Sequence, residues 1–187
     1  DYDFGIMITP DEEVGSPDGV PRLLEAGYVP SGVCVLPDGA ENQDWDIETF
    51  AKGAWFGEFT ARGKRAHGSR PWLGDNAITR LLDFTREVQA LFPAVTPEVS
   101  TLTIGRIEGG TAINQVPDHA MVAMDMRYPS VDEQQRLERA VEALREKYAI
   151  ERHDIMFMPP TINDFNDPYL QSFAASVRTV TGHESRP

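Results

Sequence analysis

The chain has 187 residues, 41% of them hydrophobic, and a formal net charge of -13 from 30 acidic and 17 basic side chains. This composition is ordinary for a soluble protein, and the length suffices for a sizeable core. Because no basic cluster is longer than Lys64-Arg65 and no apolar run has the length of a membrane span, we expect neither nucleic acid nor a membrane as a partner.

The single cysteine, Cys34, excludes an internal disulfide, and its apolar neighbours predict a buried thiol. The sequence begins with Asp1 and shows no signal peptide, so we expect a cytoplasmic origin and a start that is a cut.

Residues 1 to about 40 have the pattern of a βαβ unit. Phe4–Ile8 and Val33–Leu36 are short apolar runs typical of buried strands, and an apolar stripe between them predicts a short helix that ends near Gly27. If the two strands are parallel, the acidic residues that follow them lie at one edge of the sheet, where open α/β sheets bind ligands. These acidic residues are Glu12, Glu13 and Asp38.

The segment Thr9-Pro10-Asp11-Glu12-Glu13-Val14-Gly15 allows two interpretations. Neighbouring carboxylates in a loop can divide two tasks, because one can hold a cation while the other accepts a proton from water. Alternatively, Thr9 and Pro10 are the N-cap and first residue of a helix whose first turn favours acids. The segment alone does not decide between them.

From about residue 50 the pattern changes to alternating strands and amphipathic helices. One helix follows a cap at Asp75 or Asn76 and continues to about residue 92, and another follows the capping box that begins at Ser130. Strands are predicted at Trp55–Ala61, Val99–Ile107, Ala120–Arg127 and Asp154–Met158, the third with Ala120, Val122, Met124 and Met126 on one face. The order β-α-β-β-α-β is the ferredoxin-like split arrangement.

After this block, Asp167-Pro168 has the residues of an N-cap and a first helical position, which predicts a final helix. We therefore predict an α/β fold with three parts. A ferredoxin-like module of residues 50–160 is inserted in a partial α/β domain that comprises residues 1–49 and 161–187.

Three further side chains are candidates for function. His67 lies in the turn-rich loop 62–71, Asn114 precedes Val116-Pro117, and Arg127 ends a strand. On the residues alone, they have ordinary explanations as a solvated loop histidine, a turn residue and a surface charge. A functional explanation would have His67 stabilise an oxyanion and Arg127 bind a substrate carboxylate with its planar fork.

Four segments together resemble the dimeric metallopeptidase and deacylase family that includes acetylornithine deacetylase, succinyl-diaminopimelate desuccinylase, aminoacylase and glutamate-releasing carboxypeptidases. They cover nearly the whole chain, in the order that the family has them. They are Thr9–Gly15, Pro37-Asp38-Gly39, Gly63–Pro71 with Gly74–Ala77, and Gly109–Pro117 with Asp125-Met126-Arg127.

The resemblance implies a role for each candidate residue. Glu12 would be the general base, and Glu13 and Asp38 would be metal ligands in a site for two divalent ions, zinc first, with cobalt or manganese as alternatives. His67 would steady the oxyanion from a partner subunit, and Asn114 and Arg127 would bind the substrate. The activity implied is hydrolysis of an amide bond in an N-acyl amino acid or small peptide.

The chain departs from the family in its ligand set. Family members also have an upstream His-x-Asp pair, a bridging Asp and a ligand His near the C-terminus, and none of these occurs in this sequence. Since a zinc site needs at least three protein ligands, we expect the chain to be an inactive fragment of a longer enzyme. The alternative is a non-catalytic association module. A nucleotide-binding domain is a third possibility, but no Gly-rich phosphate loop follows a strand.

The resemblance further implies that the module of residues 50–160 is a lid domain, and that two lids pair side by side in a homodimer. The expected helix from 75 to 92 carries more apolar side chains than one face of a sheet needs, which indicates a stripe for a partner. These side chains are Leu81, Leu82, Phe84, Val88, Leu91 and Phe92.

Overall fold

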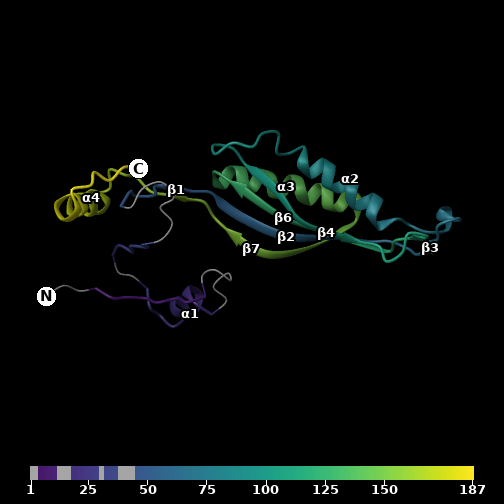
Figure 1. Cartoon of the computed structure of the whole chain (residues 1–187), viewed down its shortest axis with the longest axis horizontal. Helices are drawn as coiled ribbons and strands as arrows, with labels where there is room; N and C mark the ends of the chain where they lie inside the picture. Colours follow the sequence, from purple (N-terminus) through teal and green to yellow (C-terminus); the bar gives the residue numbers. More distant parts are fainter. Residues whose placement is uncertain (1–3, 12–17, 30–31, 38–44) are drawn as a thin grey trace.

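The computed structural model describes residues 4–11, 18–29, 32–37 and 45–187. Its largest unit is a four-stranded antiparallel sheet with the strand order β4-β6-β2-β7 (Figure 1). The strands are β2 (Gly53–Arg62), β4 (Thr101–Gly109), β6 (His119–Tyr128) and β7 (Ile150–Met158), with helices α2 (Ala77–Gln89) and α3 (Val131–Tyr148) between them. The order along the chain is thus β2-α2-β4-β6-α3-β7, which confirms the predicted ferredoxin-like arrangement.

Both long helices lie on the same face of the sheet and cover its core (Figure 1). The core forms because every second residue of the two central strands points at the helices, as the alternation on β6 predicted. Full burial of a large apolar side chain contributes about 1.5–3 kcal/mol, so this layer holds the lid together. Its members include Trp55 and Phe59 of β2, Val122, Met124 and Met126 of β6, Leu81, Phe84 and Val88 of α2, and Leu137 and Val141 of α3.

The predicted helix caps are confirmed. The Asn76 side chain accepts a hydrogen bond from the Thr79 amide at 3.1 Å, and the Ser130 hydroxyl accepts one from the Glu133 amide at 3.2 Å. Asp167 likewise caps α4 (Pro168–Thr181) by accepting from the Tyr169 amide at 2.8 Å. Each cap satisfies an amide that the first helical turn would leave unpaired.

Strand β7 begins four residues before the predicted start at Asp154. The first half of β7 is polar. Ion pairs and a cation–π contact hold it against the sheet, instead of alternating apolar side chains. The Arg152 guanidinium lies 4.5 Å from the Trp55 ring centre and donates to Asp154 at 2.7 Å. The Trp55 indole also donates to Asp154, and these bonds, Arg152 first, hold the pKa of that carboxyl below its usual value.

The two strands predicted near the N-terminus are absent from the described residues. Phe4–Ile8 and Val33–Leu36 have no regular structure and are exposed, and Cys34 is exposed rather than buried. A strand buried on both faces needs neighbouring strands and covering helices, and the described residues provide none for these runs. The short helix between them does form, as α1 (Val20–Glu25), and Gly27 beyond it adopts a φ of 88°.

In the part of the chain that the structure describes, two short paired strands join the lid to its flanking segments. The incoming strand β1 (Phe50–Ala51) pairs with the outgoing strand β8 (Thr161–Ile162), so the chain enters and leaves the lid side by side. In Figure 1, α4 lies beyond this junction, at the opposite end of the molecule from β3 (Ala66–His67). Among the described residues, no helix is long and apolar enough to cross a membrane.

Candidate functional site

His67 and Asn114 meet at the end of the lid farthest from the junction. There, β3 pairs with β5 (Gln115–Val116), so that His67 lies opposite Gln115. The Gly68 amide donates to the Asn114 carbonyl at 2.7 Å, which places the two predicted residues beside each other. We call residues 63–76 and 110–118 the lid tip; it includes the short 3-10 helix η2 (Pro71–Leu73).

Glycine is required where the strands of the tip approach. A Cβ atom on Gly63 would lie 2.1 Å from the Asp75 carbonyl oxygen, and one on Gly68 would lie 2.9 Å from that of Asn114. Contacts this short force the backbone to move. The glycines of the loop 62–71 therefore serve close packing of backbone, and this packing brings His67 to Asn114.

The His67 ring is held through one of its two nitrogens. Nδ1 lies 2.8 Å from the Ser69 hydroxyl and accepts a hydrogen bond from the Ser69 amide at 3.2 Å. The side chain is exposed, and none of the hydrogen bonds formed by the described residues uses Nε2. The ring is thus anchored on its inner side and open on its outer side.

Asn114 occupies a turn, as its ordinary explanation predicted. The Gln115 amide donates to the Ala112 carbonyl at 3.3 Å, and the Asn114 side chain is exposed on this turn. The strand β5 that follows is flanked by an ion pair between Arg65 and Asp118 at 2.8 Å. The hydrogen bond from Arg65 holds the pKa of the Asp118 carboxyl below its usual value, so the pair stays charged at neutral pH.

Arg127 lies at the other end of the sheet. It is paired with Ala54 of β2, three residues after β1, whereas β6 begins at His119 beside the tip. At about 3.4 Å per residue in an antiparallel strand, the eight steps from His119 to Arg127 span roughly 27 Å. The structure therefore brings His67 and Asn114 together but separates both of them from Arg127.

The Arg127 guanidinium is oriented by two neighbours on the open face of the sheet. Nε donates to Asp125 at 2.7 Å and Nη2 donates to the same carboxylate at 3.2 Å, while the Phe56 ring centre lies 4.9 Å from the guanidinium carbon. Two of the five N–H groups are committed, so the others can still bind a carboxylate. In the sequence, Asp125 stands out only as part of the motif Asp125-Met126-Arg127, although the spacing Asp-x-Arg on a strand already places both side chains on one face.

Glu12, Glu13 and Asp38 lie outside the described residues. Within the described ranges, no group of three or more His, Cys, Asp or Glu side chains is arranged to hold a metal ion. Glu13 and Asp38 would supply two ligands at most, which is fewer than the three that a zinc site needs. These roles therefore stay predictions from the sequence.

A search of protein families gives a direct match to the lid. The sequence profile of the M20 peptidase dimerisation domain matches residues 50–153. The chain belongs to this family. The resemblance to dimeric peptidases and deacylases, predicted from four motifs, is confirmed.

Curated relatives carry two kinds of name. A succinyl-diaminopimelate desuccinylase of Marinobacter nauticus is 25% identical over 198 residues, covering 97% of this chain and 51% of that protein. A probable carboxypeptidase of Aspergillus flavus is 38% identical over 103 residues, covering 48% of this chain and 25% of that protein. The M20 chain thus spans between a quarter and about half of the length of these relatives.

Solved structures share the fold. A tripeptidase from Staphylococcus aureus superposes with a TM-score of 0.59 at 18% identity, covering 73% of this chain and 38% of that one. Aminopeptidase PepT from Bacillus cereus superposes with a TM-score of 0.55 at 23% identity over the same shares. At these identities the likeness concerns the arrangement of helices and strands.

Proposed function

We propose that this chain is part of a metal-dependent hydrolase that cleaves an amide bond in an N-acyl amino acid or small peptide. The observation that carries the proposal is the lid tip of an M20 dimerisation domain, which presents His67 and Asn114 together on an exposed edge. An exposed ring N–H beside an exposed amide suits the binding of a developing oxyanion and a polar substrate group. Relatives named as desuccinylase and carboxypeptidase favour amide substrates.

The division of labour within the chain follows the predicted boundaries. Residues 50–160 would form the lid, and residues 1–49 and 161–187 would belong to the catalytic domain. The paired strands β1 and β8 support this division, because both crossings of the boundary lie in one two-stranded ribbon.

In the catalytic domain, Glu12 would accept the proton of the attacking water and return it to the leaving amine. Glu13 and Asp38 would be two of the ligands of a pair of divalent ions, zinc first. The remaining ligands are not found among these 187 residues. We therefore assign this chain part of a metal site and expect no hydrolysis from it alone.

The distance along the sheet supports a proposal in which each lid serves two active sites. Arg127 pairs with Ala54 at the end of β6 next to the junction with its own flanking segments. His67 and Asn114 lie at the tip formed by β3 and β5, and Figure 1 shows β3 at the far end of the lid. One small substrate cannot contact both ends of a strand that spans roughly 27 Å. Arg127 would therefore serve the active site of its own subunit, and His67 and Asn114 would reach that of the partner.

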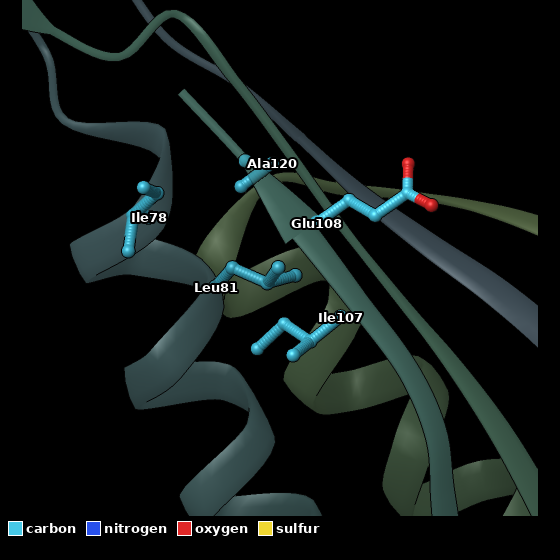
Figure 2. Close-up of a pocket in the computed structure, with 6 residues that line it drawn as sticks. Ile78, Leu81, Ile107, Glu108 and Ala120 are labelled. Carbon is cyan, nitrogen blue, oxygen red and sulfur yellow. The ribbon is translucent and has the colours of Figure 1, made fainter. Parts of the chain in front are cut away.

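The surface between α2 and β4 is the proposed contact between two lids. Ile78 and Leu81 of α2 face Ile107 of β4 across an open groove of about 170 Å³, while Glu108 points away from it (Figure 2). β4 is an edge strand, so its outer backbone groups have no partner in the four-stranded sheet. A second copy related by a two-fold axis would pair with this edge and cover the groove.

This contact predicts that the 187-residue chain is a dimer and that Ile107→Asp makes it a monomer. Ile107 is 53% exposed and lines the groove, so a carboxylate there would be buried without a partner on pairing. The matched control is Ile155→Asp, at a 57% exposed isoleucine on the opposite edge strand β7. Sedimentation at micromolar concentration should show dimers for the wild type and for Ile155→Asp. Monomeric wild-type protein, or a monomer from Ile155→Asp alone, would refute the contact.

The function is tested on the full-length parent protein and on this chain in parallel. A panel of N-acyl amino acids and dipeptides is assayed with zinc, cobalt or manganese, and with a chelator. We expect metal-dependent amide hydrolysis by the parent and none by the chain, because the chain lacks most ligands. Metal-dependent turnover by the chain would overturn the assignment of an incomplete site.

The alternative is a non-catalytic association module, which the family name alone would also suit. Both proposals predict that two lids pair. They differ in whether the full-length parent hydrolyses amide bonds. A parent without hydrolysis under any metal, whose chain still dimerises, would favour the association module.

A further inference from the structure

Ser69 contacts the inner nitrogen of His67 with two different groups. Its amide donates to Nδ1 at 3.2 Å, and its hydroxyl oxygen lies 2.8 Å from the same atom. A hydroxyl can donate or accept, but a backbone amide can only donate. Nδ1 must therefore carry a lone pair, and in the neutral ring the proton lies on Nε2.

We propose that Ser69 is a positioning residue that holds His67 in the Nε2–H tautomer, so that its outer nitrogen donates a hydrogen bond. This inference rests on the proposed function, in which that donor stabilises an oxyanion. In the other tautomer, Nε2 would present a lone pair to the developing negative charge and repel it. The choice of tautomer decides whether the same ring helps or hinders the reaction.

The backbone around His67 leaves the ring dependent on this contact. Pairing with β5 fixes the His67 main chain, the Arg70 amide donates to the His67 carbonyl at 2.8 Å, and Gly68 is bound to Asn114. With the main chain fixed, only the side-chain torsions of His67 decide where Nε2 points. Because the side chain is exposed, Ser69 is the contact that selects among these torsions.

The tautomer is measured directly by NMR on the 187-residue chain labelled with ¹⁵N-histidine, at an alkaline pH where imidazoles are neutral. The sequence has four histidines, and the His67→Gln variant assigns the resonances of His67. We expect the Nε2–H pattern for His67 in the wild type and in Ser69→Thr. Ser69→Ala keeps the amide that can only donate, so it should retain the Nε2–H pattern, while the loss of the 2.8 Å hydroxyl contact should leave the ring less fixed in its torsions and change its ring ¹⁵N shifts. The resonances of His119 and His153 are the internal control and should not move.

In the full-length parent, Ser69→Ala should lower kcat about fivefold with KM little changed, since a hydrogen bond of about 1 kcal/mol is lost at the positioned ring. Ser69→Thr should restore kcat. In a His67→Ala background the Ser69→Ala change should have no further effect, because the two residues act as one unit.

Either of two results would overturn the proposal. One is an Nδ1–H tautomer in the wild-type chain, a measurement that does not depend on the folding of any variant. The other is an unchanged kcat in a folded Ser69→Ala enzyme. A parent that hydrolyses no amide would instead refute the proposed function, and the Nε2–H tautomer in the chain would still support the role of Ser69 in orienting the ring.

Discussion

The Glu12→Gln variant of the full-length parent should fold and bind metal as the wild type does, yet lose about 10²- to 10⁴-fold in kcat. The amide of glutamine has nearly the size of the carboxylate and keeps one acceptor oxygen. It has no site that can take a proton from water at neutral pH and return it to the leaving amine. Steady-state kinetics together with metal analysis of the purified variant measures both halves of this expectation.

Two neighbouring carboxylates provide the controls for Glu12. Glu13→Gln should lose metal as well as activity, because the proposed role of Glu13 is that of a ligand. Asp11 accepts a hydrogen bond from the Asp18 amide at 2.9 Å, and the oxygen of Asp11→Asn can still accept it, so this variant should lose far less activity. Near-normal kcat in Glu12→Gln would return Glu12 to the role of a helix-start acid.

Two inactive variants of the parent should restore each other when they form mixed dimers. His67→Ala removes an oxyanion donor, which costs about 10²- to 10³-fold in kcat, and Arg127→Ala removes the fork for a substrate carboxylate. If the tip of one subunit serves the site of the other, a mixed dimer has one site with both residues intact and one with neither. Random pairing makes half of the dimers mixed, so activity should recover to about a quarter of the wild-type value.

The geometry of the lid supplies a matched control for this experiment. His67 and Asn114 lie on the same tip, so a mixed dimer of His67→Ala with Asn114→Ala has one lesion in each site and should stay inactive. Co-expression with two affinity tags isolates each mixed dimer for assay. Absence of recovery with Arg127→Ala, in dimers shown to be mixed, would place His67 and Arg127 in the same subunit's site and contradict the proposed assembly.

Much of the lid is predictable from sequence because its signals are local. The alternation Ala120, Val122, Met124 and Met126 shows which face of a strand is buried, and the side chains of Asn76 and Ser130 bind amides within three residues of themselves. Such signals need no knowledge of the rest of the chain. The continuous apolar run Phe4–Ile8 misleads, because its burial would depend on neighbouring strands that the described residues do not provide.

By itself, the sequence determined the order of strands and helices in the lid, the family, and the candidate residues His67, Asn114 and Arg127. Only the tertiary structure decided that Asn114 lies beside His67 and that Arg127 lies at the opposite end of the sheet. The reason is that antiparallel pairing at the tip joins His67 to Gln115, 48 positions apart, while two residues eight positions apart on one strand are held far from each other. Distance along the chain does not determine distance in space. The proposed sharing of active sites between subunits follows from the distance in space between Arg127 and the lid tip.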